Sequence, residues 1–407
     1  MMKSILRSPT GKSFLVAFLL VSSLYLMWGC AHGLLDVLNK HFQGVFDMTK
    51  AESGFVQFST YIAYFLMALP AGFLMRKIGY KKGIIVGLLL FAFGALAFVP
   101  AAFLHSPIPF LVALFILACG LCIIETGAHP YITAMGPEES AAQRINIAAG
   151  FNGVGWIIGP VIGGALIFGA DANDDMALAK PYMLVSGVVL LITLVFALTK
   201  LPQITSTDKP ALATDSSHKS IWQYKSFVFA VAAQFLYCGA QTGIFSFFIN
   251  YVTELDPSLS DLQASQLLGF GGMFLFLVGR LSSSFIMRWI KPDKLLQIFG
   301  LLATVCMVLV IASVGKASLY ALYASFFFMS MMFPTIFALG VEGMNDMQTK
   351  KASSYIVMGV AGGAVFPVLM GLIGKENMGL GFILPLLSFL FITYFGLRQN
   401  KLKTNQK

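Results

Sequence analysis

The chain has 407 residues, of which 57% are hydrophobic and only 11% charged, with a formal net charge of +9. A soluble domain is about one-quarter charged, so this composition excludes an ordinary soluble protein. Apolar runs of about 20 residues recur along the sequence, and each is long enough to cross roughly 30 Å of hydrocarbon as a helix. We therefore predict an all-α membrane protein, because a helix satisfies its own backbone hydrogen bonds in lipid.

The first six predicted helices lie within residues 1–200. Their expected spans are 14–38, 52–75, 83–103, 108–133, 143–169 and 181–200. A long polar stretch, residues 201–225, follows them. We interpret this stretch as a cytoplasmic linker between an N-terminal half, 1–200, and a C-terminal half, 226–407.

Six further helices are predicted in the second half, at 226–252, 262–288, 294–313, 318–341, 352–374 and 379–397. Three motifs recur in order in both halves: MRKIGYKK (75–82) and MRWIKPDK (287–294), PYITAMGPE (130–138) and PTIFALGVE (334–342), and GCAHG (29–33) and GAQTG (239–243). Their nearly constant spacing indicates a duplication. Twelve transmembrane helices in two pseudo-symmetric halves are the plan of the major facilitator fold.

Most of the 27 basic residues fall in every second connection and at both ends of the chain. By the positive-inside rule this pattern places both termini in the cytoplasm. The basic charge is therefore a topology signal, and no nucleic-acid partner is expected. We predict a monomer that spans the lipid bilayer of the bacterial inner (plasma) membrane several times.

Three charged residues fall well inside the predicted spans: Asp36, Glu125 and Arg280. A charge at the bilayer centre costs about 2.5–3.5 kcal/mol on insertion scales, so such residues are candidates for function. We expect Asp36 and Glu125 to exchange protons during coupling, with a cap of span 1 in headgroup water as the alternative for Asp36. For Arg280 a structural role is favoured.

Neutral polar residues inside the spans indicate what is bound. His129 lies four residues after Glu125 and hence on the same helix face; it could hydrogen-bond the carboxylate, contact substrate, relay protons or simply pack. Amides and hydroxyls without net charge suit the hydroxyl groups of a sugar, and aromatic residues follow nearby. These candidates are Asn152, Gln241, Thr242 and Asn250, and their alternative role is to join helices.

Several strings together are specific for one family: MWGCAHGLLDVLNKHF (27–42), ETGAHPYITAMGPEESAAQRINIAAGFNGVG (125–155), AQFLYCGAQTGIFSFFINY (233–251) and SSYIVMGVAGGAVFPVLMG (353–371). Through them the sequence resembles the fucose–galactose–glucose:proton symporter family of the major facilitator superfamily. The resemblance implies uptake of a neutral monosaccharide with a proton. It places the family's essential acids at Asp36 and Glu125 and a substrate-contacting asparagine at Asn152.

The sequence departs from the pattern of fucose-transporting members, which carry amides where this chain has His32, Gly33 and Leu35. Losing hydrogen-bond partners shifts the preferred sugar, so strict L-fucose specificity is not expected. With His32 added, the predicted substrate-binding set comprises His32, Glu125, His129, Asn152, Gln241, Thr242 and Asn250.

A transporter-like sensor that binds sugar without moving it is one other class of function, and the short ends of the chain do not favour it. A proton-driven exporter of drugs or metabolites on the same fold is the alternative hypothesis, and the direction of proton movement would separate it from uptake. An enzyme is not expected, since the sequence shows no nucleotide loop, metal-ligand spacing or nucleophile elbow. We expect no cofactor, with the proton as coupling ion and sodium left open.

Overall fold

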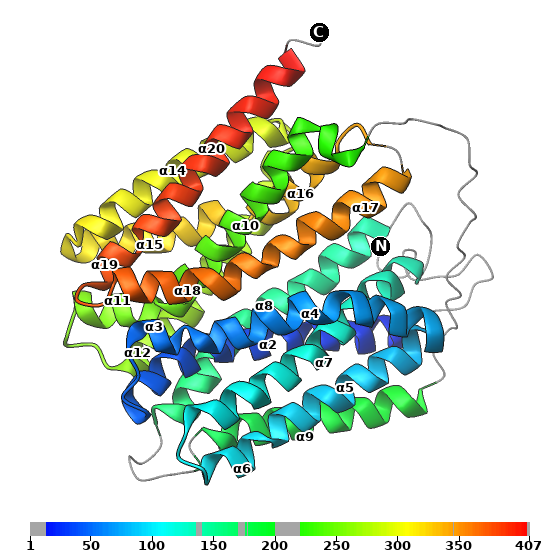
Figure 1. Ribbon diagram of the computed structural model, residues 1–407, viewed down its shortest axis with the longest axis vertical. Coiled ribbons are helices and arrows are strands. Elements are labelled where there is room, and N and C mark those ends of the chain that lie inside the picture. The colour runs from blue at the N-terminus through cyan, green and yellow to red at the C-terminus, as the bar shows by residue number, and fades with distance from the viewer. Residues whose placement is uncertain are drawn as a thin grey trace. The chain divides into compact units, whose positions relative to one another are not determined.

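The computed structural model describes residues 14–135, 141–169, 176, 178–199, 220–344 and 346–404. The regular elements in this part of the chain are all helices. They include twelve spans that are long and apolar enough to cross a membrane. The predicted all-α architecture with twelve such helices is thus confirmed (Figure 1).

The chain divides into two compact units. Unit 1 comprises Met1–Asp47, Ser59–Ser206 and Asp261–Phe270, and unit 2 comprises Met48–Phe58, Thr207–Ser260 and Gly271–Lys407. Each unit is therefore built mainly from one half of the sequence but includes a short segment from the other half. Most of the predicted linker, 201–225, lies outside the described residues, so the boundary between the two halves stays a prediction.

Unit 1 contains the helices of the first half and one from the second. Its helices are α2 (Leu15–Val45), most of α4 (Phe55–Ile78), α5 (Tyr80–Leu96), α6 (Phe98–Ala102), α7 (Pro107–Ala134), α8 (Ala141–Ile167), α9 (Ala179–Leu198) and α12 (Asp261–Leu267). Within it α5 packs against both α7 and α9, as Figure 1 shows. Large apolar side chains such as Leu69 and Leu198 are about three-quarters exposed, at 74% and 75%, as expected for a surface in contact with lipid.

Unit 2 contains the remaining helices. They are α3 (Lys50–Ser53), η2 (Ile221–Gln223), α10 (Lys225–Ser246), α11 (Phe248–Leu255), α13 (Phe274–Ile286), α14 (Pro292–Ala312), α15 (Gly315–Met329), α16 (Met332–Val341), α17 (Asp346–Val357), η4 (Met358–Ala361), α18 (Gly362–Ile373), α19 (Met378–Gly381) and α20 (Ile383–Thr404). Between α12 and α13 the chain passes through η3 (Leu268–Met273), a π-helical turn of sequence LGFGGM.

Helices α2 and α8 approach each other closely because glycines line their contact. A Cβ atom on Gly29 would collide with the carbonyl oxygen of Asn152, and one on Gly155 with the carbonyl oxygen of Leu26. Such small-residue contacts let membrane helices pack backbone to backbone. The glycines in the predicted fifth span therefore determine how the two helices that border the candidate site are held.

Several spans that the sequence predicts as continuous helices are broken in the structure. The tenth span is interrupted between α15 and α16, just before Pro334. Proline has no N–H and leaves the carbonyl four residues earlier without its helical partner. That carbonyl belongs to Ser330, and Arg280 Nε donates to it at 3.3 Å.

This contact gives Arg280 a structural explanation. Its guanidinium also lies over the Phe276 ring, 5.0 Å from the centroid, an arrangement that stabilises a cation in an apolar setting. The geometry therefore supports the expected structural role for Arg280.

Unit 2 holds its short N-terminal segment through polar contacts. Lys50 forms an ion pair with Glu254, and its Nζ also donates to the carbonyl oxygens of Gly374 and Lys375 at 2.8 and 3.1 Å. Glu254 in turn accepts from the backbone N–H of Met378 at 2.7 Å. One lysine and one glutamate thus join α3, α11 and the loop after α18.

Candidate functional site

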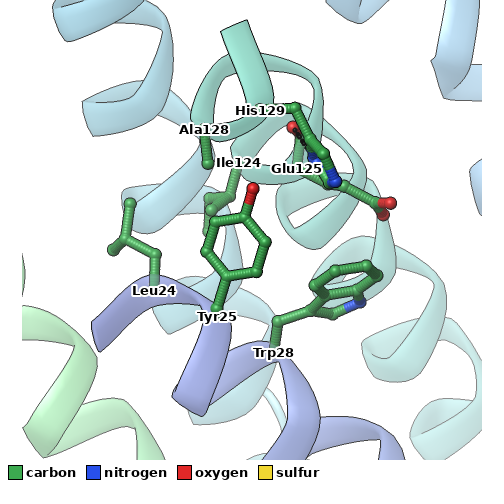
Figure 2. Close-up of a pocket in the computed structure, with 7 residues that line it drawn as sticks. All are labelled: Leu24, Tyr25, Trp28, Ile124, Glu125, Ala128 and His129. Carbon is green, nitrogen blue, oxygen red and sulfur yellow. Dashed lines mark hydrogen bonds between the residues drawn. The ribbon is translucent and has the colours of Figure 1, made fainter. Parts of the chain in front are cut away.

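A pocket opens between α2 and α7 in unit 1. It is a small pocket, lined by Leu24, Tyr25, Trp28, Ile124, Glu125, Ala128 and His129. Figure 2 shows the rings of Tyr25 and Trp28 rising from α2 to face His129, with the Glu125 carboxylate extending beyond the Trp28 ring. The predicted residues Glu125 and His129 therefore do share one pocket, as their spacing on one helix required.

Glu125 lies deep in α7, which begins with Pro107 at its first helical position. The ion pairs in the described part of the chain include Lys40–Asp261 and Lys50–Glu254, and neither involves Glu125. Glu125 is thus a carboxylate inside an apolar helix bundle that no described cation neutralises. Such an acid is a candidate for binding and releasing a proton.

The His129 ring contacts the protein backbone where a hydrogen bond to the Glu125 carboxylate was one expectation. Its Nδ1 lies 3.1 Å from the backbone carbonyl oxygen of Glu125, not from the carboxylate. The ring centroid is 5.2 Å from that of Tyr25 and 6.2 Å from that of Trp28. The backbone contact holds the ring through Nδ1, so contact with substrate, proton relay and packing all stay predictions for His129.

His32 sits on α2 in a setting of aromatic rings. Its centroid lies 5.4 to 6.3 Å from the centroids of Trp28, Tyr61, Tyr64 and Trp156. Its Nδ1 is 3.0 Å from the carbonyl oxygen of Trp28, and the side chain is buried. The structure thus places His32 directly beside the Trp28 ring that lines the pocket.

Asp36 follows one turn after His32 and is only 3% exposed. Helix α2 continues to Val45, beyond the end predicted at residue 38. Asp36 therefore does not cap the end of this span, and that alternative is wrong. The interpretation of Asp36 as a coupling residue stays a prediction.

Three polar atoms around the pocket are buried and have no hydrogen-bond partner in the described part of the protein: Tyr25 Oη, Trp28 Nε1 and Tyr64 Oη. A buried polar group without a partner costs about 1–3 kcal/mol. All three are donors, whereas an ionised carboxylate offers only acceptors. The arrangement therefore offers donors and the acceptor oxygens of Glu125 to a neutral ligand rich in hydroxyl groups.

Asn152 reaches the same site from α8. Its Nδ2 donates to the backbone carbonyl oxygen of Tyr25 at 3.2 Å, and the side chain is buried. The amide therefore fixes the position of Tyr25 at the pocket wall. Whether it also contacts substrate, as the resemblance implies, stays a prediction.

The other predicted substrate-binding residues belong to unit 2. Gln241 and Thr242 lie on α10 and Asn250 on α11. Thr242 and Asn250 are buried, and Gln241 is partly buried. Their contact with substrate also stays a prediction.

Sequence analysis overlooked Tyr64 and Trp156. Both are aromatic residues in apolar spans, where rings are common, and only the fold shows that they surround His32. Two tyrosines three residues apart, Tyr61 and Tyr64, were the available signal, because that spacing places both on one face of a helix.

Among the described residues, no metal-binding cluster is present. Such a cluster would be a group of three or more histidine, cysteine, aspartate or glutamate side chains. The expectation that the protein works without a cofactor is not tested by this finding.

Comparison with known proteins places the chain in a family. A family model described as Major Facilitator Superfamily matches residues 17–367. The L-fucose-proton symporter of Escherichia coli (strain K12) is 35% identical over 420 residues, covering 97% of this chain and 95% of that protein. The glucose/galactose transporter of Brucella abortus biovar 1 (strain 9-941) is 33% identical over 401 residues, with 96% and 95% covered.

Solved structures agree with these matches. The crystal structure of the transporter FucP in the outward conformation has a TM-score of 0.69 at 35% identity and covers 95% of this chain and 99% of that one. A D-xylose-proton symporter has a TM-score of 0.76 at 11% identity, which supports the fold alone. The chain thus belongs to the major facilitator superfamily, in one family with the L-fucose-proton symporter of Escherichia coli.

Proposed function

We propose that this protein is a secondary active transporter that takes up a neutral monosaccharide together with a proton by alternating access. Fucose, galactose, glucose and closely related sugars are the candidates, since curated relatives are named for transport of fucose and of glucose and galactose. The protein resides in the bacterial inner membrane, with both termini in the cytoplasm, and acts as a monomer without cofactor or enzymatic activity.

One observation carries the proposal. Glu125 lies in a pocket of α2 and α7 without a cation partner among the described residues, next to three buried donors that lack hydrogen bonds. An acid alone would suit many proton-coupled carriers. The additional neutral donors and aromatic rings favour a sugar, because hydroxyl groups can satisfy the donors and C–H surfaces can pack on the rings.

The residues of the site have separate roles in this proposal. Glu125 and Asp36 bind and release the proton. His32, His129 and Asn152, together with Gln241, Thr242 and Asn250, are the proposed substrate contacts, with Glu125 serving both tasks. Exporters of drugs on the same fold remain the alternative, but no observation on this chain favours that direction.

The test is transport in proteoliposomes with an imposed proton gradient. Radiolabelled L-fucose, D-galactose and D-glucose are supplied one at a time, and a pH-sensitive dye reports proton movement. The proposal predicts accumulation of at least one sugar above equilibrium and proton influx on its addition. Proton efflux coupled to a drug, with none of the sugars accumulated, would support the exporter instead.

A sodium gradient imposed without a proton gradient is the control for the coupling ion. Accumulation with sodium alone would contradict proton coupling while leaving sugar transport in place.

A further inference from the structure

Tyr64 on α4 is a partly buried residue whose buried hydroxyl has no assigned role. Its hydroxyl is enclosed and forms no hydrogen bond in the described part of the chain. A buried hydroxyl in this state destabilises the protein unless another state or a ligand provides a partner. The same position would accept phenylalanine without that cost, so the hydroxyl itself calls for an explanation.

The neighbours of Tyr64 come from two other helices. From α2, the His32 ring lies 5.8 Å away between centroids. From α7, Cys122 Sγ contacts the backbone carbonyl oxygen of Tyr64 at 3.8 Å. Glu125 follows Cys122 by three residues and therefore lies on the same face of α7, toward Tyr64.

The groups that face the Tyr64 hydroxyl are Glu125 and Cys122 from α7, Trp28 and His32 from α2, and Tyr61 from its own helix. Glu125 is the only carboxylate in this set, and the set contains no lysine or arginine. The hydroxyl thus lies near both the acid of the pocket and Trp28, whose Nε1 is also buried without a partner in the described part of the chain.

A hydroxyl in this position has two uses, because it both donates and accepts hydrogen bonds. An ionised Glu125 only accepts, so the Tyr64 proton is directed to the carboxylate. A protonated Glu125 has a hydrogen to donate, so Tyr64 can accept it and direct its own proton elsewhere. The direction of this hydrogen bond therefore reports whether Glu125 carries a proton.

We propose that Tyr64 couples the protonation of Glu125 to sugar binding: its hydroxyl donates to the ionised carboxylate and, once Glu125 is protonated, donates to a hydroxyl of the sugar instead. No covalent bond changes; the proton that arrives from solution stays on Glu125, and one hydrogen bond changes partner. The inference rests on the proposed function, since it requires that the pocket binds a sugar.

Thermodynamic linkage between proton binding and sugar binding gives this proposal a measurable consequence. If protonated Glu125 releases a donor for the sugar, protons raise sugar affinity and the sugar raises proton affinity by the same factor. Removing the Tyr64 hydroxyl weakens that coupling while leaving the carboxylate able to titrate. Sugar affinity must then fall in acidic buffer and vary less with pH.

The experiment compares the full-length protein with Tyr64→Phe in proteoliposomes without a gradient. Exchange of L-fucose, D-galactose or D-glucose, whichever the unaltered protein accumulates, is measured from acidic to alkaline buffer. We expect a loss of affinity of about five- to tenfold in acidic buffer, the size of one hydrogen bond, and a flatter pH profile. Thermal unfolding checks the fold, which should be at least as stable because the substitution removes an unsatisfied hydroxyl.

Tyr61→Phe is the matched control, on the same helix and also near His32. It should retain the unaltered pH profile. A profile unchanged in Tyr64→Phe, or flattened equally in Tyr61→Phe, would overturn the role of Tyr64. Sugar accumulation by the unaltered protein would still support the proposed function in that case, so the two failures are distinguishable.

Discussion

The corresponding glycine motifs of the two halves, GCAHG and GAQTG, lie in different surroundings. In unit 1, GCAHG on α2 places His32 among aromatic rings, with Asp36 one turn later. In unit 2, the same register on α10 places Thr242 and Ser246 at those positions, and Ser246 Oγ simply donates to the Thr242 carbonyl oxygen at 2.7 Å. The helical scaffold is repeated, but the ionisable groups are not.

The fourth and tenth spans repeat this contrast. In the register of their shared proline motif, Glu125 corresponds to Met329. The Met329 carbonyl oxygen accepts from the buried Tyr237 hydroxyl at 3.0 Å, whereas the hydroxyls of Tyr25 and Tyr64 around Glu125 have no partner in the described part of the protein. Unit 2 also has exceptions, the Tyr323 hydroxyl and Gln234 Oε1, which are buried and lack a partner in the described part of the protein; no carboxylate is among the groups that perturb Tyr323.

The different hydrogen bonding of these tyrosines indicates different roles for the two units. Satisfied tyrosines hold helices together, while unsatisfied ones beside an acid await a proton or a ligand. Proton chemistry is thus expected from unit 1, and the neutral amides of unit 2 are expected to affect only sugar affinity.

Replacing Glu125 should have the largest effect. Glu125→Gln keeps the shape of the side chain but removes its titratable group, so uphill sugar uptake in a proton gradient should fall to background. Met329→Gln, at the corresponding position of unit 2, is the comparison variant, and it should retain proton-driven accumulation. Sugar still concentrated by Glu125→Gln would contradict its assignment as a coupling residue.

Asp36→Asn should also abolish uphill uptake. At least one of the two acid variants is expected to retain exchange of sugar across the membrane, because exchange needs no net proton movement. The control is Ser246→Ala, in the same register of α10. If Asp36→Asn accumulated sugar as the unaltered protein does, coupling would have to be assigned to Glu125 alone.

The glycine contacts predict an intermediate effect on stability. Gly155→Ala directs a methyl group into the backbone of α2 at Leu26 and Cys30, and overpacking of this kind costs about 1–3 kcal/mol. Gly243→Ala meets the flexible end of Met370, which can move aside. Thermal unfolding in detergent should show a clear decrease for Gly155→Ala and a smaller one for Gly243→Ala; equal decreases would show that the two contacts are alike.

The ion pair of unit 2 should have the smallest effect. Glu254 is partly exposed, with 36% of its side chain accessible, and such pairs contribute about 0.2–1 kcal/mol. Glu254→Gln should therefore lower the unfolding temperature slightly and retain sugar accumulation. Asp256→Asn, in the same connection, is the control. Complete loss of uptake in Glu254→Gln would mean that charge in unit 2 also takes part in coupling.

Much of the fold follows from hydrophobic length alone. Twelve apolar runs were predicted, and the described part of the chain contains twelve candidate spans. The breaks within spans were not predicted, because they depend on partners from elsewhere in the fold. Pro334 interrupts the tenth span where Arg280, distant in sequence, is available for the freed Ser330 carbonyl.

The candidate site was predictable only in part. Glu125 stands out in an apolar run, and helical spacing then identifies His129. Tyr64 does not stand out, since tyrosine in a membrane span is also typical of the lipid interface. Its neighbours include His32 on α2 and Cys122 on α7, and nothing in its own span reveals this.

Each unit includes one short segment from the other half of the sequence, Met48–Phe58 in unit 2 and Asp261–Phe270 in unit 1. These segments affect the order in which the units can fold during synthesis. Met48–Phe58 is synthesised early, yet its partner α18, where Pro367 and Val368 abut Gly54, emerges near the end. Unit 1 likewise waits for Asp261–Phe270, whose Ser265 abuts Gly164 of α8. Unit 1 therefore cannot reach its mature packing until the chain has been made beyond Phe270, and a chain truncated before α18 would leave Met48–Phe58 without its partner.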